Sequence, residues 1–473
     1  MKIARLTFRL GPSLWSGLLV IVMLLCSPAP LFAADAGASS DTPSVPKDPV
    51  DPFRVQGYFS GKYVSRTSRL SDEKIRDEDV FGELRLDIAR QESSGPEFHF
   101  FGTVRNNLSN IGDRNSYSVF EDIGNTYDTS AHGYLYEAHL DLNQPFSNFS
   151  QIRIGRQDSV RDEPVFFDGI AADVKVSQKV NLSLYGGAAI HFFEIDNRWG
   201  DDWLGGLGLD YLPRAGTWLN MDYLYVDDTR NLYGTLNQHD HLVSFKLGQR
   251  FTPNLKATAK IRYLNNEQRD LKLRIIGTVP EADIEMQAAY FRQSRTQNEL
   301  SNEFSVFYDV IGQTNPFQSY DIRVRKLFGI HYAIDLGYFE RTLLDSQQES
   351  AFNRAYRRSY AVLDMIDLVF DGLSFSITGE QWKSGPQSFN SAGFDAGYAF
   401  SKGRRSPKVN AGSYYSLYKY DYYSSLGERT NVRTYYVKCD YPFAQHYTLN
   451  GSYEFEQGLE DYQTAKLGMR YDF

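Results

Sequence analysis

Cysteine is nearly absent from this sequence, with two residues in 473. Cys26 falls in an N-terminal apolar run, and removal of that run as a secretory leader leaves Cys439 alone. A single cysteine cannot form an intramolecular disulfide. The mature chain is therefore not a small domain held together by disulfides.

Motifs that carry chemistry are absent as well. The sequence has no CxxCH for c-type haem attachment, no GxxxxGK(S/T) for nucleotide phosphates, and no GxSxG or HExxH for hydrolysis. Isolated Ser, His and Asp residues are too common to indicate catalysis. We therefore expect a chain that is not an enzyme and that uses neither a cofactor nor a bound metal.

Long hydrophobic runs are missing after the N-terminus. Three basic residues precede an apolar run from Leu14 to Cys26, which is too short to span a bilayer comfortably. This pattern predicts a signal peptide over 1–34. The Pro- and Ser-rich stretch 35–52 cannot bury apolar surface and predicts a disordered periplasmic linker. The remaining domain is 53–473.

A surplus of positive charge is also lacking. The formal charge of the whole chain is −9, and loss of the three basic residues of the leader takes it to about −12. Nucleic acid, which is bound through basic surfaces, is therefore not expected as a partner.

Aromatic residues, in contrast, are abundant. They make up 15% of the chain, with 33 Tyr and 32 Phe, although the mean hydropathy is −0.45. Apolar and polar residues alternate with period two in segment after segment, as in "FGELRLDIAR" (81–90) and "NLKATAKIRY" (254–263). In "AKLGMRYDF" (465–473) the alternation runs to the last residue, so the final strand must be paired.

Two architectures give such alternation: a sandwich or soluble barrel with apolar side chains inside, and a membrane barrel with lipid outside and water inside. Strands that carry Arg and Lys in register, in a secreted, aromatic-rich chain, favour the second. We therefore predict an all-β fold, a transmembrane antiparallel β-barrel in the outer membrane of a Gram-negative bacterium. Its partners are expected to be outer-membrane lipid, lipopolysaccharide and the barrel-assembly machinery, which would read the C-terminal Phe473.

The strand number follows from the spacing of short turns, which lie on the periplasmic side of such barrels. Turns at "LPRAG", "FTPN", "VPEA", "LFGIH", "FDGL" and "YPFAQ" give about 22 strands, within a range of 18 to 24. This count treats 295–317 as one long external loop. The chain before Phe53 leaves no room for a plug domain.

The polar faces of the strands would line the lumen and set its selectivity. One wall is expected to be basic and to favour anionic solutes, the opposite wall to be acidic. The alternative is a ladder of cross-strand ion pairs that only satisfies a polar face. The basic wall comprises Lys246, Arg250, Lys256, Lys260, Arg262, Lys272, Arg274, Arg323 and Arg325, and the acidic wall Glu83, Asp87, Glu137, Asp141 and Asp173.

One hairpin has carboxylates and imidazoles at both ends. Asp227 and Asp228 leave one strand, and His239, Asp240 and His241 enter the next. Such groups could hold a divalent cation. The simpler interpretation, which we favour, is a solvated loop tip.

From Ile152 the chain reads "IRIGRQDSVRDEPVFFDGI", a strand with Gly-Arg-Gln, then a loop, then Phe-Asp-Gly. Arg156 and Asp168 lie across this hairpin and could pair to fix its register. The segment resembles porin-like outer-membrane channels of the alginate-export type. The matching residues are Gly155, Arg156, Gln157, Phe167, Asp168 and Gly169.

We expect a porin-like channel that passes ions or hydrophilic solutes across the outer membrane. The alternative is a barrel that acts as a sleeve for a periplasmic partner, either a redox protein such as a multihaem cytochrome or an export protein, in a trans-outer-membrane conduit. A barrel-embedded lipid hydrolase is a third interpretation, with no motif behind it. Solute-dependent current and a co-purifying coloured partner would separate the first two.

Overall fold

The computed structural model describes residues 53–473 apart from 71–72, 91–94, 110–129, 160, 164, 191–201, 228–238, 296–314, 350–353, 402, 404, 421–427 and 459–460. The expected signal peptide and linker lie outside the described residues, as does most of the expected loop 295–317. No helix in the described part of the chain is long and apolar enough to cross a membrane, a finding that concerns helices alone.

The described residues form 22 antiparallel strands, each paired with the next along the chain. The strands are β1 (Phe53–Leu70), β2 (Glu73–Arg90), β3 (Pro96–Asn107), β4 (Ala131–Asn143), β5 (Phe149–Asp158), β6 (Phe166–Ser177), β7 (Val180–Ile190), β8 (Trp203–Arg214), β9 (Thr217–Asp227), β10 (His239–Thr252), β11 (Leu255–Leu264), β12 (Glu267–Val279), β13 (Ile284–Gln293), β14 (Phe317–Phe328), β15 (Tyr332–Leu343), β16 (Tyr356–Ile366), β17 (Leu373–Ser384), β18 (Gln387–Ala399), β19 (Lys408–Tyr420), β20 (Glu428–Pro442), β21 (Tyr447–Gln457) and β22 (Asp461–Asp472).

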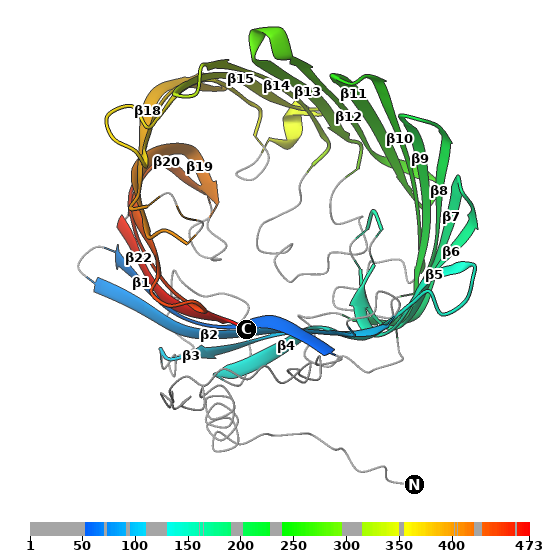
Figure 1. The fold of residues 1–473 in the computed structure, drawn as a ribbon. Helices are drawn as coiled ribbons and strands as arrows, with labels where there is room; N and C mark the ends of the chain where they lie inside the picture. Colours follow the sequence, from blue (N-terminus) through cyan, green and yellow to red (C-terminus); the bar gives the residue numbers. More distant parts are fainter. Residues whose placement is uncertain are drawn as a thin grey trace, which may run out of the picture. The chain divides into compact units, whose positions relative to one another are not determined.

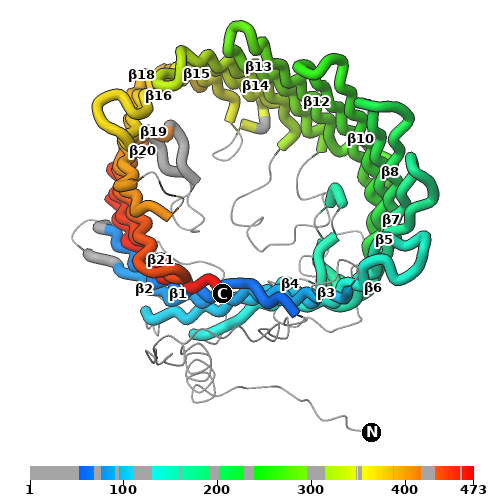
Figure 2. Tube along the Cα trace, in the orientation of Figure 1, coloured from blue at the N-terminus to red at the C-terminus, as the bar shows by residue number. Residues whose placement is uncertain are grey.

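The sheet closes on itself because β1 also pairs with β22, and Figures 1 and 2 show the resulting ring. Gly57 and Phe473 donate their backbone N–H groups to each other's carbonyl oxygens at 3.1 Å. The last residue is therefore bound into the sheet, which explains why the alternation persists to the C-terminus. The predicted number of strands is confirmed.

The connections differ between the two ends of the barrel. Those that follow even-numbered strands are short, such as 215–216 between β8 and β9 and 253–254 between β10 and β11. All six turns named from the sequence lie at this end, which we call the periplasmic end because short turns face the periplasm in outer-membrane barrels. The opposite, outer end carries the longest connections, including 294–316 between β13 and β14, together with two-residue connections such as 265–266 and 385–386.

Apolar side chains cover the outside of the ring. Ile154, Ile170 and Leu247 are about half exposed, and they alternate with residues that point inward. Closure gives every strand a partner on both sides, which satisfies the backbone groups of the paired segments within a bilayer. Closure together with the apolar outer face establishes an outer-membrane β-barrel.

The inner face is not uniformly polar. A buried apolar cluster extends over the inner side of β6 to β11 near the outer end and includes Val165 from the β5–β6 connection. Simple alternation did not predict it. Its members are Val165, Phe167, Ala189, Leu204, Leu224, Val226, Leu242 and Leu264. This cluster supports the connection that folds against it.

Candidate functional site: the lumen wall

The hairpin of β5 and β6 begins with a distorted backbone. Gly155 has φ of 127°, and a Cβ atom there would lie 2.3 Å from the carbonyl oxygen of Ala138, so only glycine fits. Gln157 is fully buried and donates from Nε2 to the carbonyl oxygens of Gly155 and Gly169 at 3.3 and 3.2 Å. Phe167, opposite Gln157, is also fully buried.

The expected pairing across this hairpin is confirmed. Arg156 donates from Nε and Nη2 to the two carboxylate oxygens of Asp168, both at 2.7 Å, a bidentate pair. The six residues that carry the resemblance thus shape the base of the β5–β6 connection. Their likeness to the alginate-export type remains a resemblance.

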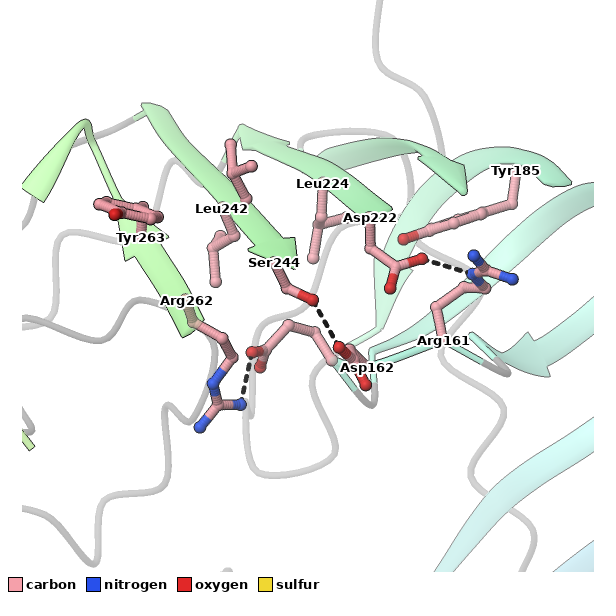
Figure 3. A pocket seen from close by; sticks show the side chains of 11 residues that line it. Arg161, Asp162, Tyr185, Asp222, Leu224, Leu242, Ser244, Arg262 and Tyr263 are labelled. Atoms are coloured by element: carbon pink, nitrogen blue, oxygen red, sulfur yellow. Dashed lines mark hydrogen bonds and ion pairs between the residues drawn. The ribbon is translucent and has the colours of Figure 1, made fainter. Parts of the chain in front are cut away.

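The β5–β6 connection, 159–165, extends to strands far from its own hairpin. Arg161 donates from Nε to Asp222 on β9 at 2.5 Å (Figure 3) and from Nη1 to Asp210 on β8 at 3.1 Å. These carboxylates lie on the inner face, with the buried Leu224 two residues beyond Asp222. The connection therefore folds inward, against the lumen wall.

The next two residues of the connection pair with basic residues of that wall. Asp162 lies 3.2 Å from Lys260 Nζ and accepts a hydrogen bond from Ser244 Oγ. Glu163 lies 2.8 Å from Arg262 and 3.1 Å from Arg269. We call Arg161, Asp162 and Glu163 the latch. The cation Arg161 contacts carboxylates of the wall, and the anions Asp162 and Glu163 contact its basic residues.

Arg161 and Asp162 of the latch have shifted pKa values. Burial would raise the pKa of the Asp162 carboxyl, but the hydrogen bond from Ser244 and the charge of Lys260 outweigh burial and hold it below the ordinary value. Burial would lower the pKa of the Arg161 guanidinium, yet Asp210 and Asp222 raise it. The contacts therefore favour the charged form of both side chains.

The nine residues of the expected basic wall fall into two groups. Lys260 and Arg262 pair with the latch, while Arg323 pairs with Asp335 at the Nε atom, 2.7 Å away, and Arg325 lies 3.3 Å from Asp364. A ladder of cross-strand ion pairs, the alternative expectation, describes Arg262 with Asp270 and Arg323 with Asp335. Lys260 instead pairs with the β5–β6 connection, and Arg325 pairs with a strand beyond its neighbour. The wall is therefore not uniformly open.

The other five form no ion pair with any described residue, and we call them the basic patch: Lys246, Arg250, Lys256, Lys272 and Arg274. Lys256 lies 5.0 Å from the centre of the Trp218 ring, and Arg274 donates to Gln287 at 2.7 Å. All but Lys246 are exposed. The patch extends from the Lys246 and Lys272 level toward the periplasmic end of β10 to β12.

Four of the five residues of the expected acidic wall lie on neighbouring strands, β2 and β4 to either side of β3. Asp87 accepts from His99 Nδ1 at 2.6 Å, and Asp141 from Arg153 Nε at 2.8 Å. Asp173 lies apart on β6, where it accepts from Ser183. In Figure 1, β2 to β4 lie across the ring from β12 to β14.

Sequence reasoning missed a groove of about 510 Å³ on the wall from β14 to β20. Guanidinium groups and carboxylates alternate along it, ending with Arg358 beside Glu380, and tyrosines such as Tyr360 and Tyr436 complete it. These residues occupy polar positions of alternating strands, a signal that was available. Their assembly into one concave surface depends on the register of seven strands.

The hairpin considered for a divalent cation brings together only two of its described candidate ligands, His239 and Asp227, whose Nδ1 and Oδ1 atoms are 3.1 Å apart. His239 and His241 lie against Tyr225 and Tyr223, with Nδ1 to hydroxyl distances of 3.2 and 2.8 Å. Asp240 is buried and accepts from Asn265. His239 and Asp240 alternate between the two faces of β10, and Asp228 lies outside the described residues.

No family model matches this sequence, and no curated protein matches it. Solved structures that are similar include the P pilus usher (PapC) translocation pore, at 10% identity over 88% of this chain and 99% of the other, with a TM-score of 0.48. A BenF-like porin from Pseudomonas fluorescens Pf-5 has 9% identity over 89% and 98%, with a TM-score of 0.42. Pseudomonas aeruginosa OpdQ has 11% identity over 89% and 98%, with a TM-score of 0.39. All three TM-scores lie below 0.5, so the identification of a closed barrel rests on the strand pairing described above.

Proposed function

We propose that this protein is a porin-like channel that passes ions or hydrophilic solutes across the outer membrane and catalyses no reaction. The observation that carries the proposal is the basic patch, which forms no ion pair with a described residue and faces the lumen of a closed barrel. Unpaired charges on a channel wall attract counter-ions and raise their local concentration. The patch therefore favours anionic solutes.

The positions of the latch and the groove indicate where a solute would pass within this lumen. It occupies the side of β8 to β12 and is held by ion pairs, while the groove of β14 to β20 leaves a concave surface elsewhere on the wall. The guanidinium groups of the groove are paired with carboxylates of the wall, whereas tyrosine hydroxyl groups there can bind polar solutes. A small hydrophilic solute that bears an acidic group would fit both surfaces.

No feature of the described residues favours the sleeve interpretation over the channel. Lipid, lipopolysaccharide and the barrel-assembly machinery are proposed as partners of the outer face and of Phe473, whose backbone closes the ring. Each follows from the class of barrel rather than from a contact.

Current through a single protein tests the proposal. The purified mature chain is inserted into a planar bilayer, and its conductance and its reversal potential under a salt gradient are recorded. We expect a steady conductance with preference for anions. A correctly folded barrel that carries no current would overturn the channel and favour the sleeve.

A further inference from the structure

Two histidines and an aspartate meet on the inner face of β3 and β4, near the periplasmic end. His99 and His139 are directly opposite in register, and their rings stack with centroids 4.9 Å apart. Asp141 lies two residues beyond His139 on the same face, whereas Leu140 between them is exposed on the outside. One ligand atom from each of the three residues lies within 4.8 Å of the others.

Hydrogen bonds fix the orientation of both imidazoles. His99 Nδ1 lies 2.6 Å from a carboxylate oxygen of Asp87, and His139 Nδ1 lies 3.2 Å from the carbonyl oxygen of Arg156. Both partners are acceptors, so each Nδ1 carries the hydrogen, and each neutral ring has its lone pair on Nε2. Carboxylate or carbonyl groups hold metal-binding histidines in this way.

The two Nε2 atoms then point toward a third acceptor. Asp141 carboxylate oxygens lie 3.6 Å from His99 Nε2 and 3.8 Å from His139 Nε2, beyond hydrogen-bond distance. Glu97 adds an oxygen 3.7 Å from His99 Nε2. Three or four lone pairs therefore point toward one space, and a cation bound in that space would coordinate them.

Burial and access suit a bound ion. His139 and Asp141 are 5% and 3% exposed, so water competes little for their lone pairs, while the 21% exposed side chain of His99 opens the group to the lumen. Two imidazoles with carboxylate oxygen match Zn²⁺ and similar first-row ions better than Ca²⁺ or Mg²⁺, which prefer oxygen alone.

Neighbouring groups set the strength of such a site. Arg153 donates to both oxygens of Asp141, and Gln151 donates to one of them at 2.8 Å. These bonds orient the carboxylate: Oδ2 accepts two of them and Oδ1 accepts one, so Oδ1 keeps a free lone pair. The guanidinium charge opposes a cation. The surrounding carboxylates outnumber the guanidinium groups of Arg85 and Arg153: they are Asp87, Glu97, Glu137 and Asp141.

We propose that His99, His139 and Asp141 form a binding site for a divalent transition-metal ion, with Zn²⁺ as its representative, on the lumen wall. The ligand atoms close by small side-chain rotations to the spacing of a tetrahedral site. The ion enters from the lumen. The site does not depend on the proposed transport activity.

Metal binding to the purified, untagged mature barrel in detergent tests this proposal directly. After treatment with a chelator and its removal, Zn²⁺ is titrated by calorimetry, and Co²⁺ absorption reports the ligand geometry. We expect one saturable ion per chain, lost at least about tenfold in affinity in His99→Gln and in His139→Gln. A matched double variant on the outer face, His239→Gln with His241→Gln, should bind as the wild type does.

Arg153→Gln separates a metal site from a merely structural cluster, because it removes the opposing charge while leaving all three ligands. We expect tighter Zn²⁺ binding, by at least about threefold. Circular dichroism and resistance to unfolding in detergent confirm that each variant is folded. No saturable binding by the wild type, or full binding by folded His99→Gln, would overturn the site, whether or not the barrel conducts.

Discussion

The outer and periplasmic halves of the wall formed by β10 to β12 both carry lysine and arginine, but they differ in whether these cations are paired. Toward the outer end, Lys260 and Arg262 contact the latch, beside a buried apolar cluster. Toward the periplasmic end, Lys272 and Arg274 have no carboxylate partner among the described residues and are exposed. Cations of the same strands are thus paired where a carboxylate reaches them and open where none does, and we propose that the open ones attract solute.

The largest loss of stability is expected when a carboxylate of the latch is removed. Glu163→Gln removes one carboxylate from Arg262 and Arg269, which are 21% and 9% exposed, so that the two cations are left with Asp270 as their shared carboxylate. Breaking a largely buried pair from one side costs about 3 kcal/mol in the free energy of unfolding. Urea unfolding in lipid vesicles measures it, with Glu281→Gln in an exposed turn as the control. Equal stability of the two variants would mean that the latch is not held by these pairs.

A second test acts on the base of the β5–β6 connection without touching a charge. Gly155→Ala places a Cβ atom 2.3 Å from the carbonyl oxygen of Ala138 at a left-handed backbone position. We expect a loss of about 2 kcal/mol in the free energy of unfolding. The same substitution at Gly61, where a Cβ would meet nothing within 4 Å, is the control and should cost much less.

A change of pH is expected to have a smaller effect on the free energy of unfolding. The pKa of Asp162 is lowered in the folded protein, so its contribution to stability is fully present above the unfolded value of about 3.9 and is lost as pH falls through the folded value. The stability difference between wild type and Asp162→Asn should therefore stay constant from pH 7 to 5 and shrink only in stronger acid. A difference that disappears already near pH 6 would rule out this ion pair as its source.

The strands could be predicted because their signals are local. Alternation and turn residues specify a strand within about ten residues, and the turn before "TWLNMDYLYV" needs only Gly216 at φ of 82°. The Arg156–Asp168 pair was accessible for the same reason, since it spans one hairpin.

The latch could not be predicted, because its partners are distant in sequence. Arg161 reaches Asp222 across 61 positions, and Glu163 reaches Arg262 across 99. Nothing in the alternation of β11 distinguishes Lys260, which is paired, from Lys256, which is not. The His99 and His139 pair was missed similarly, because two histidines 40 positions apart meet only through the register of β3 and β4.

The most direct test of the division between paired and open charges compares two double variants by reversal potential in a planar bilayer. Lys272→Gln with Arg274→Gln removes open charges, and Lys260→Gln with Arg262→Gln removes charges paired with the latch. The control is Lys179→Gln in the β6–β7 turn with Lys383→Gln, which shares the outer face of β17 with Ile377. We predict that the first pair lowers the anion-to-cation permeability ratio by roughly twofold or more, and that the other two leave it close to wild type. An equal or larger shift from the latched pair would contradict the account.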